Sequence, residues 1–329
     1  MTSYLPFLFI LVASVLSQLN DRPVIGILDQ PAGDGLTYRG NTSYLAANYV
    51  KWVESSGARV VPVWFNSSKD KLKEQFSHLN GYTYILIPTL IRRSILFTGG
   101  DLVLSENATY VETARYLLQL ALEENDRGVH FPVWGTCQGF ELLSVLIGGE
   151  GALELQAFDA ENLSLPLTWS TEADQSRMLA DMSDDIYVNL ENLPLTINLH
   201  HDGVYPQTFQ KNNRMRKFFR MIAQNVDRKG TPFASVMEGR KYPVYGVQFH
   251  PERNAFEWNV RESVSHSRQA IRASQYFGDF FVDEARKNDH RYDTAADEAK
   301  ALIYNYNPYY SEDSTDSWPD EQTYAFQWQ

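Results

Sequence analysis

The stretch Val133-Trp-Gly-Thr-Cys-Gln-Gly-Phe140 decides the fold. Residues 131–134 are a short apolar run that predicts a buried strand, and residues 141–146 have the pattern of a helix. Cys137 therefore stands at a sharp turn from strand to helix, with a glycine two residues away on either side. This arrangement is typical of a nucleophile elbow, in which a tight turn strains the central residue and presents its side chain above the sheet.

The elbow also predicts how a reaction at Cys137 would be supported. The backbone N–H of Gln138 can donate a hydrogen bond to the oxyanion of a tetrahedral intermediate. The helix that begins there brings its positive dipole end near the sulfur, which favours the thiolate. A tight structural turn is the alternative interpretation of a Gly-x-Cys-x-Gly pattern by itself, so the catalytic interpretation requires a base elsewhere in the chain.

Cys137 is the only cysteine among the 329 residues, so no intramolecular disulfide can form. A buried thiol that only fills space in an apolar core is the alternative interpretation of such a residue. The two glycines around Cys137 favour the nucleophile.

A candidate base follows far downstream, in Gly246-Val-Gln-Phe-His-Pro-Glu252. His250 stands at the end of a predicted strand, and Glu252 comes two residues later. A cysteine nucleophile needs an imidazole to take and return protons, and the imidazole needs an acceptor on its other nitrogen. A histidine at a strand end is also common as a structural residue, so the pair is a hypothesis at this point.

Strands alternate with helices along the first half of the chain. Continuous apolar runs predict strands at 23–28, 59–64 and 95–97, and such runs are typical of a buried parallel sheet. Helical spacing occurs at 44–56, 69–78 and 108–124. This order predicts an α/β fold in three layers, with a mostly parallel central sheet flanked by helices on both faces.

The alternation is looser after residue 149, where the apolar segments are short: 165–168, 186–190, 218–224 and 234–237. A strand is predicted again at 242–249 and a helix at 270–288. Residues 311–329 are an acidic C-terminal tail that either wraps the surface or is mobile. No internal repeat and no linker composition divides residues 18–310, which are expected to form one domain.

The overall charge excludes one class of partner. The formal net charge is −12, and no basic cluster is longer than Arg92-Arg93, so the positive field that nucleic-acid binding requires is absent. A hydrophobic content of 43% and a charged content of 21% are those of an ordinary globular protein.

The N-terminal residues 1–17 predict a cleaved signal peptide, because residues 5–17 are apolar and end in small residues. The run is too short for a comfortable membrane span, although an uncleaved anchor or a buried strand is the alternative. Four glycosylation sequons agree with passage through the secretory route; they lie at Asn41, Asn66, Asn107 and Asn162.

Gly-Thr-Cys-Gln-Gly followed by Val-Gln-Phe-His-Pro-Glu resembles the class I glutamine amidotransferase-like superfamily, whose fold is flavodoxin-like. Within it, the chain is similar to the gamma-glutamyl hydrolase family over nearly its whole length after the signal segment. The matching stretches are 22–28, 46–63, 131–141, 237–252, 281–288 and 300–304.

The resemblance implies a hydrolase that cleaves gamma-linked glutamate from folate polyglutamates without a metal or other cofactor. Cys137 would be the nucleophile, His250 the general acid and base, and Glu252 the third member. His200 would lie near the substrate, although the adjacent His201 makes this register ambiguous. The family also implies a homodimer that acts in lysosomes, in vacuoles or after secretion, with no stable membrane insertion once the signal is cleaved.

A glycine pair at a strand end, Gly99-Gly100, is the expected second source of oxyanion donors, with a structural turn as the alternative. Directly upstream, residues 82–94 depart from the family pattern. They are either a genuine insertion or a gene-model artefact, and a genuine insertion could displace the glycines.

Two rival functions remain open: a glutaminase-type amidotransferase subunit that shares the Cys-His-Glu set, and a binding module that has lost its chemistry.

Overall fold

The computed structural model describes residues 19–32, 42–78, 94–105, 108–287, 292, 294–311 and 320–327. The predicted signal peptide, residues 82–93 of the unusual segment, and the sequons at Asn41 and Asn107 lie outside the described residues. Within these ranges no helix combines the length and the apolar character that a membrane crossing requires.

The central sheet has eight strands in the order β4-β1-β5-β6-β12-β11-β10-β8. The pairs among the first five of these strands are all parallel, and the last three strands run antiparallel to their neighbours. The mostly parallel sheet is therefore confirmed. The strands are β1 (Val24–Leu28), β4 (Arg59–Val63), β5 (Ser94–Phe97), β6 (Val133–Thr136), β8 (Thr168–Trp169), β10 (Phe219–Val226), β11 (Pro232–Gly239) and β12 (Val244–Val247).

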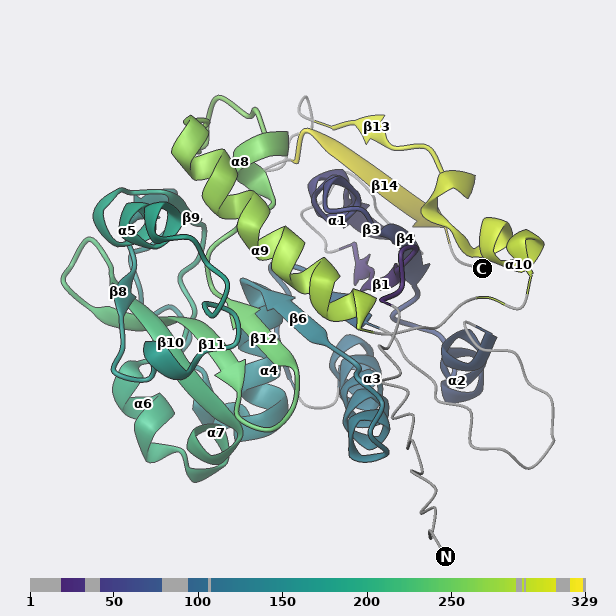
Figure 1. Ribbon diagram of the computed structural model, residues 1–329, viewed down its shortest axis with the longest axis horizontal. Helices are drawn as coiled ribbons and strands as arrows, with labels where there is room; N and C mark the ends of the chain where they lie inside the picture. The colour runs from purple at the N-terminus through teal and green to yellow at the C-terminus, as the bar shows by residue number, and fades with distance from the viewer. Residues whose placement is uncertain are drawn as a thin grey trace, which may run out of the picture.

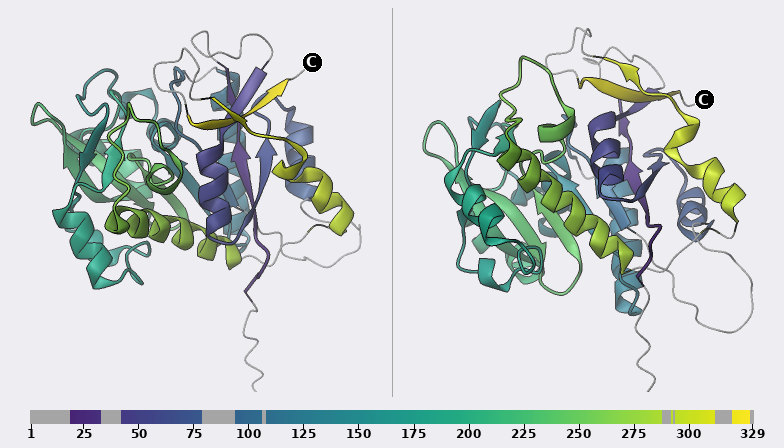
Figure 2. Two further views of the ribbon diagram at one scale, coloured as in Figure 1. Left: turned by 90° about the horizontal axis from the view of Figure 1, so that it is seen from above. Right: turned by 45° about the horizontal axis from the view of Figure 1, so that its top comes forward.

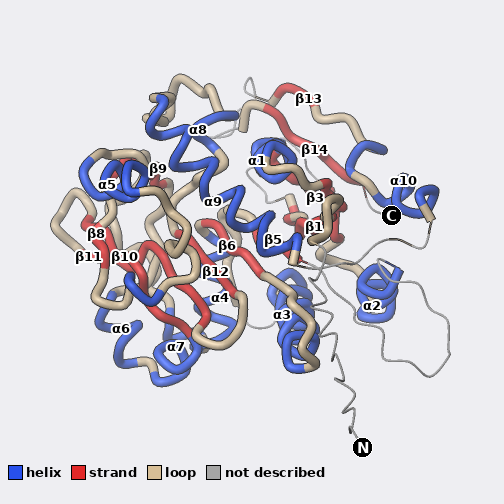
Figure 3. The backbone as a smooth tube through the Cα atoms, in the orientation of Figure 1, coloured by secondary structure: helices blue, strands red, loops and turns tan. Residues whose placement is uncertain are grey.

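Helices cover both faces of this sheet, which gives the three predicted layers (Figure 1; Figure 3). On one face, α1 (Ala47–Ser55) and α9 (Arg268–Arg286) pack against each other and share a core with alternate residues of the strands. On the other face, α3 (Thr109–Asp126) and α4 (Gln138–Gly148) share a second core with the intervening strand residues. Burial on both faces explains why the strands are continuously apolar in the sequence.

Several boundaries differ from the sequence predictions, and three differences are informative. The helix predicted at 44–56 begins only at residue 47, because the residues before it form β3 (Thr42–Ala46) and pair with another strand. The strand predicted at 131–134 is β6, two residues later, where it pairs with β5 and β12. The short segment at 186–190 lies inside a helix, α5 (Asp184–Asn192).

A second sheet joins the two ends of the chain, in the order β13-β14-β3-β2. It contains β2 (Gln30–Pro31), β13 (Tyr309–Tyr310) and β14 (Gln322–Gln327), and β14 runs antiparallel to β3. Figure 2 shows β14 close to α1 and β3. The described part of the predicted acidic tail thus packs on the domain.

The remaining elements surround the antiparallel half of the sheet or lie at its edges. They are α2 (Lys69–His78), β7 (Leu163–Leu165), β9 (Thr196–Asn198), α6 (Pro206–Lys211), α7 (Asn213–Phe218), α8 (Arg253–Phe256) and α10 (Ala295–Ala301), with short 3-10 turns at Glu150–Ala152, Ala173–Gln175 and Ile303–Asn305.

The elbow between β6 and α4 has the predicted strained geometry. Cys137 has φ 49° and ψ −109°, a combination that costs free energy for any residue with a side chain. A Cβ atom at Gly135 would overlap the backbone of Gly139, and a Cβ atom at Gly139 would overlap the backbone of Phe97. The two glycines are therefore required by the close approach of backbone to backbone.

We expect Gly139→Ala to destabilise the fold. The new methyl group would force α4 away from β5, and overpacking of this kind typically costs about 1–3 kcal/mol, or several degrees in Tm. Gly151→Ala is the matched control, because nothing lies within 4 Å of a Cβ atom built there. Thermal unfolding followed by circular dichroism measures both variants, and equal Tm values would contradict the packing argument.

Candidate functional site

Cys137 and His250 follow two adjacent parallel strands at their carboxyl ends. The Cys137 N–H donates to the Val247 carbonyl over 2.8 Å, so the elbow is tied to the last residue of β12. His250 follows three residues later and donates its own N–H to Ile197. The carboxyl edge of a parallel sheet is where α/β proteins place their sites, and both candidate residues lie there.

His250 and Glu252 form the predicted pair. Nδ1 of His250 lies 2.7 Å from Oε1 of Glu252, and both side chains are buried. A neutral imidazole that donates from Nδ1 keeps its lone pair on Nε2. Nε2 is buried and has no hydrogen-bond partner among the described residues. The pair therefore leaves the far nitrogen of His250 available as a base.

Gly99 lies in contact range of Cys137, His250 and a tyrosine, Tyr49. A Cβ atom at Gly99 would lie 2.7 Å from both Cε1 of His250 and the Tyr49 hydroxyl, and 3.4 Å from Cβ of Cys137. The Tyr49 hydroxyl also lies 3.3 Å from Nδ1 of His250. Only glycine leaves space at this position, and the sequence carried no sign of Tyr49 beyond its place in a predicted helix.

The glycine pair expected to supply the second oxyanion donor, Gly99-Gly100, has two backbone N–H groups in different environments. The Gly99 N–H already donates to the Tyr49 hydroxyl over 2.8 Å. No hydrogen bond of the Gly100 N–H occurs within the described ranges, and Gly100 is exposed. Its N–H is therefore the one of the two that remains free to donate.

Gln30 shapes this glycine pair and was missed by the sequence analysis. Its side-chain Nε2 donates to the Gly99 carbonyl over 2.7 Å and to the Thr98 hydroxyl over 3.2 Å. A Cβ atom at Gly100 would overlap the Gln30 amide. A buried glutamine after β1 gives no recognisable motif, because its partners come from a strand almost seventy residues away.

Gln138, the first residue of α4, is the predicted donor. Its backbone N–H acts to lower the pKa of the Cys137 thiol. The side chain is buried and donates to the Leu102 carbonyl over 2.8 Å. The N–H of Gln138 thus lies beside the atom at which a tetrahedral intermediate would form.

Burial and the N-terminus of α4 act in opposite directions on the pKa of the Cys137 thiol. Desolvation raises the pKa of the Cys137 thiol well above its usual range, and the carboxylates of Glu141 and Glu252 act in the same direction. Burial and these carboxylates thus oppose the N-terminus of α4, which was expected to favour the thiolate.

His200 is the inward-facing member of the two adjacent histidines. Its Nδ1 lies 2.7 Å from the Asp202 carbonyl, and its Nε2 lies 3.3 Å from Oδ1 of Asn198. Burial lowers the pKa of His200 to about 3, so the ring is neutral near pH 7. His201 is about half exposed. The carbonyl of Leu199, the residue before His200, lies 3.9 Å from the Cys137 sulfur, which places His200 near the site.

Glu141 is a further buried acid next to the nucleophile. It accepts a hydrogen bond from Nε2 of Gln248 over 2.8 Å, and burial raises its pKa to about 7. Between about pH 4.5 and pH 7 the folded protein thus keeps a proton that the unfolded chain has released. The protonated Glu141 carboxyl therefore contributes its full stabilisation of the folded state below about pH 4.5. This contribution declines as the pH rises and is lost above about pH 7.

We therefore expect stability to fall from pH 5 to pH 7.5 and to fall less in Glu141→Gln. The full effect of this carboxyl would be up to about 3 kcal/mol. The free energy of unfolding in urea at several pH values measures it. Glu112→Gln, at an exposed position of α3, is the control and should keep the wild-type slope. An unchanged slope in Glu141→Gln would exclude this carboxyl as the source.

Within the described ranges, no group of three or more His, Cys, Asp or Glu side chains is arranged to hold a metal ion. The protein groups at the site are one thiol, one paired imidazole and backbone N–H groups. This set is sufficient for acyl transfer through a covalent intermediate.

Comparison with known proteins agrees with this chemistry. The family model described as Peptidase C26 matches residues 23–252, from the residue before β1 to the last residue of the Cys-His-Glu set. The chain belongs to the peptidase C26 family.

Curated relatives in this family are similar over most of their length. Gamma-glutamyl hydrolase B of Dictyostelium discoideum is 38% identical over 95% of this chain and 85% of its own. Gamma-glutamyl hydrolase of Mus musculus is 40% identical over 89% and 86%, and that of Homo sapiens is 39% identical over 88% and 86%. A solved glutamine amidotransferase of Thermotoga maritima is 14% identical, with a TM-score of 0.37, over 70% of this chain and 76% of that one.

Proposed function

We propose that this protein hydrolyses gamma-glutamyl bonds, including those of folate polyglutamates, through a thioester on Cys137. Membership of the peptidase C26 family and similarity to gamma-glutamyl hydrolases over most of the chain support this reaction. The observation that carries it is the position of Cys137, on a strained elbow hydrogen-bonded to the strand that leads to His250 and Glu252.

In this mechanism His250 Nε2 takes the thiol proton while the Cys137 sulfur attacks the gamma-amide carbon. The backbone N–H groups of Gln138 and Gly100 stabilise the resulting oxyanion. The tetrahedral intermediate then breaks its C–N bond, and His250 returns the proton to the departing glutamate nitrogen. A raised pKa of the thiol makes this transfer from sulfur to imidazole and back part of each turnover.

The second half regenerates the enzyme. Water attacks the thioester carbon, His250 accepts a proton from the water, and the carbon–sulfur bond breaks. The sulfur recovers its proton from His250, and the acyl product leaves as a carboxylate. Glu252 accepts the Nδ1 hydrogen bond throughout and so fixes the tautomer and the ring orientation of His250.

We expect Cys137→Ala to lose about 10,000-fold or more in hydrolysis, and Glu252→Gln to lose about 100-fold or more. Chromatography of the products from a defined folate polyglutamate at about pH 5 to 7 measures both. Gly151→Ala should keep wild-type turnover, because it lies in an open turn.

Two outcomes would contradict the proposal. Unchanged turnover in Cys137→Ala would exclude the thioester. Release of ammonia from free glutamine, without cleavage of gamma-glutamyl peptides, would instead favour the glutaminase alternative.

We further propose that the protein enters the secretory route through residues 1–17 and acts as a homodimer in lysosomes, in vacuoles or outside the cell. The two sequons within the described residues differ in a way that tests this route. Asn66 is exposed on the turn after β4. Asn162 uses both amide atoms: Nδ2 donates to the Arg261 carbonyl over 3.1 Å, and Oδ1 accepts from the Ser263 N–H.

Glycopeptide mass spectrometry of the protein secreted from a eukaryotic host should therefore find a glycan at Asn66. Asn162 should be largely free of one, because a glycan on Nδ2 would crowd the backbone that this nitrogen contacts. Asn66→Gln should remove the corresponding mass, and Asn162→Gln should not. Retention of the unmodified chain inside the cell would contradict the secretory route.

A further inference from the structure

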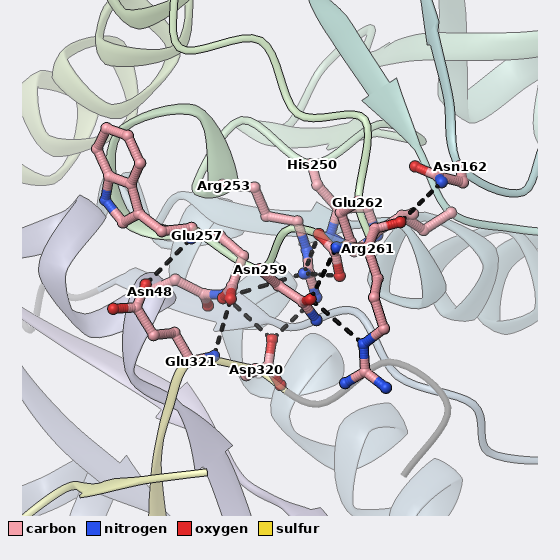
Figure 4. Close-up of polar contacts among 12 residues, drawn as sticks. Asn48, Asn162, His250, Arg253, Glu257, Asn259, Arg261, Glu262, Asp320 and Glu321 are labelled. Carbon is pink, nitrogen blue, oxygen red and sulfur yellow. Dashed lines mark hydrogen bonds and ion pairs between the residues drawn. The ribbon is translucent and has the colours of Figure 1, made fainter. Parts of the chain in front are cut away.

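Behind His250 lies a buried ion cluster that the proposed reaction does not use. Its centre is Arg253, the residue after Glu252, whose side chain is only 8% exposed. Four carboxylates lie within 4.0 Å of the guanidinium, and Figure 4 labels Glu257, Glu262 and Asp320 around it. The four carboxylates belong to Glu252, Glu257, Glu262 and Asp320.

The contacts within this cluster are unequal. Nη1 of Arg253 donates to both oxygens of Glu262, over 2.6 and 2.7 Å, and Nη2 donates to Asp320 over 2.9 Å. These two carboxylates fix the plane of the guanidinium. Nη1 is 4.0 Å from Glu257, which is too far for a hydrogen bond.

The third edge of the guanidinium faces the catalytic carboxylate. Nε of Arg253 lies 3.8 Å from Oε1 of Glu252, the oxygen that accepts from His250. Glu252 is fully buried, and its Oε2 has no hydrogen-bond partner among the described residues. Nε of Arg253 is likewise without one. Arg253 therefore supplies a permanent positive charge close to this carboxylate, as a charge and not as a donor.

Asp320 reaches this cluster from the far end of the chain. It lies two residues before β14, the strand that pairs with β3, and it accepts a hydrogen bond from Nδ2 of Asn48 over 3.2 Å. The same Nδ2 donates to Glu257 over 3.0 Å. The next residue, Glu321, donates its N–H to Glu257 over 2.8 Å. Figure 4 shows Asp320 and Glu321 entering the cluster from the side opposite to His250.

We propose that Arg253 is a positioning residue for the His250–Glu252 pair and that Asp320 holds Arg253 in place, so that residues 320–327 complete the functional site. This inference rests on the proposed roles of His250 and Glu252. The path runs from β14 through Asp320, Arg253 and Glu252 to the imidazole, with one polar contact at each step.

A cluster that only stabilised the fold would have a different consequence. Its loss would lower Tm and the amount of folded protein without changing the turnover of the molecules that remain folded. Loss of a positioning residue lowers turnover itself, because a small displacement of a general base can cost about 100-fold in rate. Substrate affinity would change little, since no residue of the cluster needs to touch the substrate.

The decisive variants are Asp320→Asn, Arg253→Met and Arg253→Lys in the full chain. Asp320→Asn keeps the shape of the side chain and removes its charge, so it tests the proposal even if Arg253→Met fails to fold. Glu284→Gln is the matched control. Glu284 is also a buried carboxylate with a cationic partner, Lys287, and its other hydrogen-bond partners are His130 and Tyr245 and not His250.

Two readouts are needed on the folded fraction. The first is steady-state hydrolysis of a gamma-glutamyl substrate, with kcat and KM determined separately. The second is the rate at which iodoacetamide alkylates Cys137, the only thiol in the chain. In this reaction the sulfur displaces iodide and passes its proton to His250, so the rate reports on the base without any assumption about the substrate.

We expect Asp320→Asn to lower kcat and the alkylation rate about tenfold, Arg253→Met to lower both further, and Arg253→Lys to recover part of the loss. KM should stay within about twofold of the wild-type value. Glu284→Gln should lower Tm and leave both rates at wild-type values.

Wild-type alkylation and turnover in folded Asp320→Asn and Arg253→Met would overturn the proposal. So would equal losses in Glu284→Gln. If the wild-type chain hydrolyses no gamma-glutamyl substrate, the proposed function fails, and the alkylation rates still decide whether Arg253 and Asp320 act on His250.

Discussion

The hydrogen bond from the Cys137 N–H to the Val247 carbonyl extends the pairing of β6 with β12 by one step beyond the ladder. Because of this bond, the strained elbow and the segment that carries His250 and Glu252 start from the same edge of the sheet. The strain at Cys137 persists because surrounding contacts over-determine it: backbone packs directly on backbone at Gly135 and at Gly139. The geometry of the whole site depends on these close approaches.

Burial sets the electrostatics of the site. The thiol and the carboxyl of Glu141 both lie out of water, and the pKa of each is raised. A buried carboxylate such as Glu252 is costly unless an opposite charge is near, and here a single guanidinium serves several acids at once. Such an arrangement ties the acid next to His250 to the C-terminal segment, far away in the sequence.

Much of this could be predicted from local patterns. Cys137 sits in a short motif whose glycines are needed by the turn itself, and His250 ends an apolar strand, so each signal lies within a few residues. Tyr49, Gln30 and Asp320 could not be found in this way. Tyr49 looks like one more core position of a helix, Gln30 follows a strand without any pattern, and Asp320 stands in a stretch whose composition is that of a solvated tail.

The sequence by itself determined the class of fold, because continuous apolar strands alternating with helices can be buried only in a parallel sheet covered on both faces. It also supplied the candidate reacting groups, because the side chains of cysteine, histidine and glutamate carry their chemistry with them. Only the tertiary structure decided the state and surroundings of those groups. Burial raises the pKa of the Cys137 thiol, and contacts between distant segments occupy the N–H of Gly99 and place Asp320 close to Arg253. Local sequence patterns predict neither burial nor such contacts.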